Sequence, residues 1–169
     1  MKYLVLAFLF LLCFPVLCSS QSDSTYFSRL TKIKYYETKQ FTVKSFIDYM
    51  MLIDVSFPEI ALRQSIEETS WFKAKNFRLG NNLFGLRTRR GYLKFNHWTQ
   101  SVKAYRRLQQ KHLSKTTKTY TCGYKFVKDM KYARNKRYVK NLRRINLSRL
   151  KINHDSLLLQ RNNGSEFQL

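Results

Sequence analysis

The stretch from Pro58 to Trp71 (PEIALRQSIEETSW) constrains the fold most, because it predicts one helix with a defined start. A proline at the first helical position and an acid in the first turn are typical of a helix N-terminus, and Ser56 precedes them as a candidate cap. The helix is expected to end near Ser70. A loop rich in asparagine and glycine follows, so Glu68, in the last turn, is expected at the floor of a cleft.

The remaining segments predict more helices and very little strand. Apolar residues recur at helical spacing in several of them, and Thr42 is a candidate cap for the first. Between 73 and 98 three glycines interrupt the pattern, which favours loops with one short hairpin at most. The predicted helices are 42–55, 99–113, 122–132 and 135–145, whereas 21–41 is polar and basic without a clear period. The expected fold class is mainly α, with a small loop or β-hairpin lobe.

The N-terminus is typical of an export signal. Lys2 precedes an apolar run, 3–16, and small polar residues begin at Ser19. The run is too short to span a bilayer, so secretion is the expected outcome, with a cut near Ser20. Cys18 is an alternative lipid-anchor site, although the residues before it lack the small side chain expected there.

These features divide the chain into four parts. They are a signal peptide at 1–20, a polar basic leader at 21–41, one folded domain at 42–146 and a basic, polar C-terminal tail at 147–169. A domain of this length is able to bury a real core. The expected localisation is the periplasm or cell envelope of a bacterium, and nothing in the sequence requires more than a monomer.

The net charge constrains the partners. Thirty-two Lys and Arg against ten Asp and Glu give a formal charge of +22. Outside the cell, such a charge favours an anionic wall polymer or a membrane surface, whereas inside it would favour nucleic acid. The export signal supports the first possibility, so no nucleic-acid partner is expected. Aromatic residues interleaved with Lys and Arg suit a sugar-binding groove and a nucleic-acid groove equally well.

Two adjacent glutamates end the helix at 58–70, and their expected surroundings differ. Glu67 has Arg63 four residues before it, so an exposed ion pair of about 0.3–0.5 kcal/mol is expected there. Glu68 follows a small, uncharged stripe, with Trp71 three residues on. A carboxyl beside an aromatic ring in a half-dry cleft has its charged form disfavoured, which raises its pKa. Glu68 is therefore the better general-acid candidate; the alternative is a helix-end glutamate facing solvent.

Four motifs follow one another along the chain: residues 58–73 (PEIALRQSIEETSWFK), 81–87 (NNLFGLR), 95–105 (FNHWTQSVKAY) and 132–142 (YARNKRYVKNL). In this order they resemble motifs of secreted bacterial glucosaminidases of glycoside hydrolase family 73 and its relatives. The first is similar to the PEIVLAQAILETGWFKS segment of that family. Residues 81–87 (NNLFGLR) match NNLFGLR, and 95–105 (FNHWTQSVKAY) match FDHWxxSVxxY. Residues 132–142 (YARNKRYVKNL) resemble GYAEDPxYxxKL. Together the motifs cover about 57–145, which is nearly all of the chain after the signal.

The resemblance implies a lysozyme-like helical domain that cleaves the β-1,4 bond after N-acetylglucosamine in peptidoglycan. It places Glu68 on the family's catalytic acid and Tyr132 on the tyrosine opposite in the cleft. Leu83 and Tyr105, in the same motifs, are expected in the core. The substrate-binding candidates are Gln64, Asn81, Asn82, Phe84, Tyr92 and Tyr138, whose amides suit acetamido and hydroxyl groups and whose rings suit pyranose faces.

The chain also departs from the family's pattern. Ser70 replaces the motif's glycine, and Glu67 replaces an apolar residue. No Asp or Glu occurs between Glu68 and Asp129. A two-carboxylate glycosidase needs a partner about 5–5.5 Å away for retention or about 6.5–9.5 Å away for inversion. The substrate's own acetamido group could assist instead, or a water held by Tyr132 and an asparagine could attack. A third possibility is a non-catalytic wall-binding domain on the same fold.

Other reactive residues offer weaker signals. His97, His112 and His154 lack metal-ligand spacing, so neither a metal nor another cofactor is expected. After removal of the signal, Cys122 is the remaining cysteine, which excludes an internal disulfide framework. It is expected to be a small core residue rather than a nucleophile.

Overall fold

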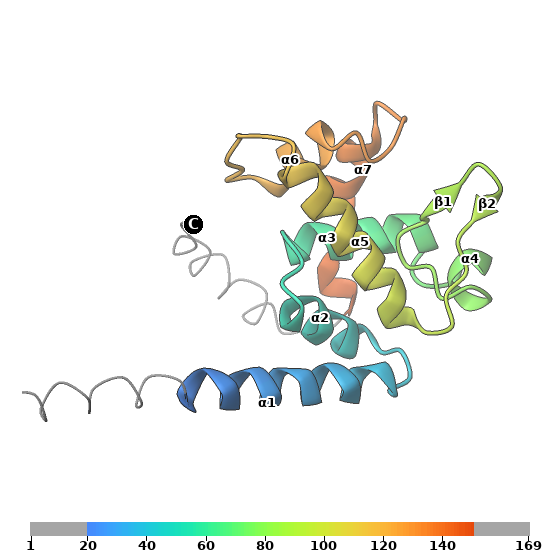
Figure 1. Cartoon of the computed structure of the whole chain (residues 1–169). Helices are drawn as coiled ribbons and strands as arrows, with labels where there is room; N and C mark the ends of the chain where they lie inside the picture. The colour runs from blue at the N-terminus through green and yellow to red at the C-terminus, as the bar shows by residue number, and fades with distance from the viewer. Residues whose placement is uncertain (1–19, 151–169) are drawn as a thin grey trace, which may run out of the picture.

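The computed structural model describes residues 20–150 as a mainly helical domain (Figure 1). In chain order its elements are α1 (Ser20–Glu37), α2 (Val43–Leu52), α3 (Pro58–Thr69), α4 (Lys75–Arg78), β1 (Arg87–Thr88), β2 (Gly91–Tyr92), α5 (Trp98–Leu113), α6 (Gly123–Asp129), α7 (Tyr138–Arg144) and the 3₁₀ turn η1 (Leu147–Leu150). The predicted signal before Ser20, with Cys18, and the tail beyond Leu150 lie outside the described residues. Within 20–150, no helix has the length and hydrophobicity to cross a bilayer.

Helix α3 lies between the other elements. Figure 1 shows α1 and α2 at one end of the domain, α6 and α7 at the other, and the β1–β2 hairpin with α4 at the side. Helix α3 contacts α2, α4 and α7. Its buried side chains are Ile60, Ala61, Leu62, Gln64, Ser65, Ile66 and Thr69. The C-terminal turn of α3 is therefore held between α7 and the hairpin lobe.

Two apolar clusters hold these elements together. In the larger, the ring of Phe84 stacks on Tyr105, with 3.9 Å between the centroids, and Trp98 packs nearby. The expected core positions of Leu83 and Tyr105 are confirmed. Each fully buried apolar side chain contributes about 1.5–3 kcal/mol, so Phe84 fixes the loop that carries it. The smaller cluster joins α3 to α6 and α7 through Ile60, Phe126, Val127, Tyr138 and Leu142.

The predicted mainly α fold with a small hairpin lobe is confirmed. Helix α2 begins as predicted, because the Thr42 hydroxyl accepts a hydrogen bond from the Ser45 N–H at 3.0 Å. In the antiparallel hairpin, Arg87 pairs with Tyr92. The short helix α4 was not predicted.

Helix α1 is the largest difference from the sequence-based prediction. It packs on the domain through the partly buried Ile33 and Tyr36. Arg29 adds a hydrogen bond from Nε to the carbonyl of Leu52 at 3.0 Å and an ion pair with Asp54. Two partly buried apolar positions in five turns are too few to produce a helical hydrophobic period, so the sequence pattern showed a polar leader.

The two C-terminal helices are shorter than predicted. Lys131 adopts a left-handed conformation just after α6. The side chain of Asn135 accepts a hydrogen bond from the Arg137 N–H at 2.8 Å, and this local turn competes with helix. Helix α7 therefore begins at Tyr138. Cys122, at the start of α6, is exposed, so its predicted place in the core is wrong.

The start of α3 also differs in detail. The N-cap position is Phe57, at φ 53°, and it has no side-chain cap. Ser56 lies one residue before the N-cap and does not cap the helix, and its backbone is bound to α5. Gln109 of α5 accepts from the Ser56 N–H at 3.0 Å and donates to the Ser56 carbonyl at 2.8 Å.

Ser70→Gly is expected to raise the free energy of unfolding by about 0.5–1 kcal/mol. Ser70 caps α3 at φ 47°, a left-handed conformation that costs an L-residue about 1–2 kcal/mol and that glycine adopts freely. Glycine also loses more backbone entropy on folding, which offsets about 0.5–1 kcal/mol of that gain. Urea denaturation measures the change. Ser114→Gly is the matched control, because Ser114 caps α5 at φ −65°. An equal gain in both variants would contradict the strain argument.

Candidate active site

Glu68 lies in the last turn of α3, facing α7 and the 81–86 loop. Its side chain is partly buried, and its Oε1 accepts a hydrogen bond from the Tyr138 hydroxyl at 2.9 Å. Burial raises the pKa of Glu68, the bond from Tyr138 opposes this by favouring the ionised form, and the charge of Glu67 adds to the rise. The net pKa is above that of an exposed glutamate, as expected from the sequence. Glu68 therefore keeps its proton to a higher pH.

A row of buried polar groups connects Tyr138 to the opposite side of the domain. Gln64 donates to the Tyr138 hydroxyl over a long 3.5 Å contact and accepts a hydrogen bond from the Tyr105 hydroxyl. Gln109 in turn donates to the Tyr105 hydroxyl at 3.1 Å and binds the backbone just before α3. Each hydroxyl accepts one bond and donates another, so every bond in the row points toward Glu68. Such a network fixes the orientation of its last donor.

The 81–86 loop meets Glu68 at Gly85. This glycine has φ +58°, and a Cβ added to it would lie 2.5 Å from Oε2 of Glu68. Glycine is therefore required both for the backbone conformation and for the close approach. Asn82 fixes the loop, because its Nδ2 donates to the Leu86 carbonyl at 2.7 Å and its Oδ1 accepts from the Leu86 N–H at 3.0 Å. The same Nδ2 also bonds the segment after the hairpin.

Tyr132, in the connection between α6 and α7, completes the group around Glu68. Its ring stacks on Tyr138 with 5.8 Å between centroids and meets Tyr105 edge-on at 5.9 Å. Its hydroxyl donates a hydrogen bond to the backbone carbonyl of Phe84. Burial raises the pKa of Tyr132 well above its ordinary value, and the neighbouring groups add to the rise. The phenol stays neutral, so it can hold a polar group by hydrogen bonding but cannot serve as a base at neutral pH.

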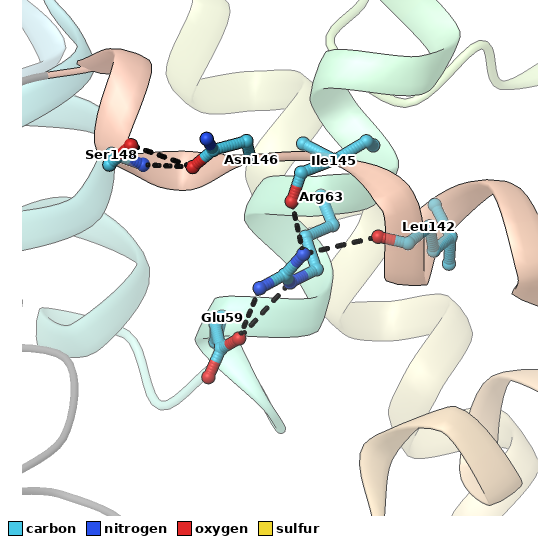
Figure 2. A network of polar contacts seen from close by, with 6 residues as sticks. All are labelled: Glu59, Arg63, Leu142, Ile145, Asn146 and Ser148. Carbon is cyan, nitrogen blue, oxygen red and sulfur yellow. Dashed lines mark hydrogen bonds and ion pairs between the residues drawn. The ribbon is translucent and has the colours of Figure 1, made fainter.

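The predicted ion pair between Arg63 and Glu67 does not form. Figure 2 shows its guanidinium bound to Glu59 instead, one turn earlier, with Nη2 2.9 Å from Oε1. The same group donates to the carbonyls of Leu142 at 3.2 Å and Ile145 at 2.6 Å. These carbonyls lie at the C-terminal end of α7, where a helix leaves carbonyl groups without partners and favours a cation. Arg63 therefore fastens α7 to α3.

Glu67 and Trp71 lie in a hollow of about 330 Å³ rather than with Glu68. Glu67 accepts a hydrogen bond from Asn141 at 3.0 Å. The guanidinium of Arg149 lies 4.6 Å from the centroid of the Trp71 ring. Helix α3 ends at Thr69 and the chain then turns left-handed, so the helical spacing that predicted Trp71 beside the acid does not apply. Tyrosines take that place.

The structure places the remaining site candidates on the outer lobe. Asn81 is partly buried and donates to the Phe95 carbonyl at 3.0 Å. Tyr92, on β2, is 56% exposed, with the Arg87 guanidinium 5.4 Å from its ring centroid. The candidates that the fold gathers near Glu68 are Gln64, Phe84, Tyr132 and Tyr138.

Three of the predicted substrate-binding residues, Gln64, Asn82 and Phe84, have no exposed surface. In this structure they support the site from behind.

Sequence reasoning missed Gln109 and the close approach at Gly85. Gln109 lies one turn after the buried Tyr105 on the apolar side of α5, and this position could have identified it. The glycine of the NNLFGLR motif could have identified the close approach at Gly85.

Most of the other described carboxylates pair with cations. The pairs are Glu37–Lys103, Asp48–Lys44, Asp54–Arg29, Glu59–Arg63 and Asp129–Lys118. Glu67 is the acid whose charge acts on Glu68. Within the part of the chain that the structure describes, His, Cys, Asp and Glu side chains form no group of three that could hold a metal ion.

Comparison with known proteins identifies the family. Residues 43–148 match the family model for glucosaminidase, described as mannosyl-glycoprotein endo-beta-N-acetylglucosaminidase. Comparisons with curated proteins and with solved structures found no match. The matched region runs from α2 into η1 and includes every residue around Glu68. Since it spans more than half of the chain, this protein belongs to the glucosaminidase family of glycoside hydrolases.

Proposed function

We propose that this protein is an exported peptidoglycan hydrolase that cleaves the β-1,4 bond after N-acetylglucosamine, with Glu68 as the general acid. Family membership supports hydrolysis of glycosidic bonds in peptidoglycan. The observation that carries the specific proposal is the partly buried Glu68 carboxyl, bound by Tyr138 and with a raised pKa. The net charge of +22 suits anionic wall polymers, and the N-terminal apolar run suits export.

In this mechanism Glu68 protonates the glycosidic oxygen as the bond breaks. Tyr138 holds Oε1, so the carboxyl plane has a fixed orientation. Gly85 has no side chain to collide with Oε2, so the loop can approach the carboxyl closely. A general acid works best when its pKa lies near the working pH, and burial moves the pKa of Glu68 in that direction.

The attacking group is the substrate's own acetamido oxygen in this proposal. A retaining glycosidase needs a second carboxylate about 5–5.5 Å from the acid, and an inverting one needs it about 6.5–9.5 Å away. Substrate-assisted enzymes are the exception, because the substrate itself supplies the attacking group. The cation-paired carboxylates are not suited to that role, and Glu67 is bound by Asn141 on α7. Water hydrolyses the resulting cyclic intermediate, with Glu68 as the base that accepts its proton.

We assign Tyr132 the role of orienting the acetamido group. Its hydroxyl hydrogen is directed at the Phe84 carbonyl, so the oxygen lone pairs are left to accept from an N–H. Its high pKa keeps the hydroxyl in that state. Gln64 and Tyr138 are positioning residues, because they act through Glu68.

Tyr138→Phe is expected to move the alkaline limb of the pH profile of kcat/KM to higher pH. The limb reports loss of the Glu68 proton in the free enzyme. The Tyr138 hydrogen bond favours the ionised carboxylate and lowers the pKa of Glu68, so its removal raises that pKa. Tyr120→Phe is the matched control, because its hydroxyl bonds Asp129 at 3.4 Å, away from the site. A limb that stays in place, or shifts equally in both variants, would contradict the assignment.

Product analysis tests the function itself. Purified peptidoglycan digested by the mature protein should release muropeptides with a reducing N-acetylglucosamine end. A reducing N-acetylmuramic acid end or an anhydro sugar would overturn the proposed bond specificity or reaction. The alternative of a non-catalytic wall-binding domain is favoured by the missing second acid; it predicts binding to walls with no new ends of any kind.

A further inference from the structure

The hollow beside the active site has the composition of a second binding site. It has a volume of about 330 Å³ and lies between the end of α3, the end of α7 and η1. Glu67, the neighbour of Glu68 in the chain, contributes to its wall, together with Trp71. The hollow and the candidate acid therefore share the last turn of α3.

The walls of the hollow are held in place by contacts within the protein. Asn141 of α7 donates to Glu67 at 3.0 Å and joins the two helices across the hollow. The Trp71 ring lies under the guanidinium of Arg149, 4.6 Å from its centroid. Ile145, the residue just after α7, also lines the hollow, and Arg63 donates to its carbonyl at 2.6 Å. These contacts give a largely preformed site, which lowers the entropic cost of binding.

The charges in the hollow indicate an anionic ligand. Arg144, in the last turn of α7, and Arg149 both line it. Among the side chains that the structure describes, neither arginine forms an ion pair, whereas Glu67 already has a donor in Asn141. Two guanidinium groups beside an indole ring suit a carboxylate attached to a partly apolar body, because arginine binds carboxylates through paired N–H donors.

We infer that this hollow binds the carboxylate-bearing peptide stem on the muramic acid next to the cleaved bond. Arg144 and Arg149 bind a stem carboxylate, Trp71 packs against the stem, and Glu67 accepts one of its amide N–H groups. The inference rests on the proposed function, and it gives the protein a preference for peptide-substituted strands over bare glycan. Strands without stems carry only the lactyl carboxylate of muramic acid, and chitin carries no carboxylate.

Calorimetric titration of the mature protein in the Glu68→Gln background tests the inference without hydrolysis. The two probes are an N-acetylglucosaminyl-N-acetylmuramyl peptide and neutral chitotetraose. The double variant Arg144→Ala, Arg149→Ala should bind the peptide-bearing probe about ten-fold or more weakly, as expected for charge-assisted hydrogen bonds, with unchanged affinity for chitotetraose. Arg143→Ala is the matched control, because Arg143 lies over Tyr124, 4.9 Å from its ring centroid.

Each result decides between the inference and its failure. Equal losses for both probes, no loss for either, or no measurable binding of the peptide-bearing probe would overturn it. Thermal unfolding checks that the exposed arginine variants remain folded. The proposed function fails separately: wild-type protein that releases no reducing ends from walls refutes hydrolysis. Hydrolysis that proceeds while the arginine variants treat bare and peptide-bearing strands alike refutes only the stem site.

Discussion

Glu68→Gln is expected to reduce the rate of cell-wall hydrolysis by about 10²–10⁴-fold, because glutamine has the shape of the acid but cannot donate its proton. Tyr138 can still bond the amide oxygen, so the site geometry is kept. Dye release from labelled peptidoglycan measures the rate. Glu37→Gln, which changes a partly buried glutamate of α1 paired with Lys103 of α5, is the matched control and should retain full activity. Undiminished hydrolysis by Glu68→Gln would refute the assignment of the acid.

The same variant should be more stable than the wild type at neutral pH, which separates loss of chemistry from loss of fold. Burial raises the pKa of Glu68 in the folded protein above its unfolded value. The stability that this carboxyl contributes is complete below the unfolded pKa and is lost as the pH rises through the folded pKa. Glutamine has no such loss. The stability difference should therefore grow from acid to neutral pH in urea denaturation.

Gly85→Ala is expected to cause the second-largest loss of activity. The new Cβ would lie 2.5 Å from Oε2 of Glu68, so either the acid or the 81–86 loop must move. A displacement of about 1 Å in a catalytic group costs about 10²-fold in rate. The left-handed φ of +58° adds about 1–2 kcal/mol of destabilisation. Dye release measures the first effect and urea denaturation the second.

Gly91→Ala is the control that separates backbone strain from contact with the acid. Gly91 also has a positive φ, of +125°, but a Cβ there meets no atom within 4 Å. This variant should lose stability while hydrolysis continues. In a Glu68→Ala background the contact with the carboxyl is absent, so Gly85→Ala should destabilise only through its left-handed backbone conformation. If Gly85→Ala is as active as Gly91→Ala, the loop does not position the acid.

The sequence predicted the elements whose residues interact locally. Pro58 and the apolar spacing defined α3, and Thr42 defined the start of α2. Glu68 was identified because its own helix lacks a nearby cation, and the structure gives it a raised pKa for the predicted reason, burial. The three glycines of 73–98 marked the hairpin lobe. These inferences needed no knowledge of how distant segments pack.

What the sequence could not supply was the long-range pairing around the acid. Tyr138 reaches Glu68 across 70 positions, and Gln64 meets Tyr105 across 41. Arg63 pairs with Glu59 rather than Glu67, because its guanidinium also donates to two carbonyls at the end of α7, 79 and 82 positions away. These bonds hold the guanidinium on the Glu59 side. Glu59 and Glu67 are both four residues from Arg63, so helical spacing alone favours neither. The packing of α7 decides between them.

The proposed mechanism requires burial to keep the Glu68 carboxyl protonated at a pH where an exposed glutamate is ionised. Carbon-13 NMR titration of the side-chain carboxyl groups tests it most directly, with the Glu68 resonance assigned by its absence in Glu68→Gln. This resonance should titrate at a higher pH than the ordinary value for glutamate, because burial raises the pKa of the carboxyl. Titration at or below that ordinary value would contradict it.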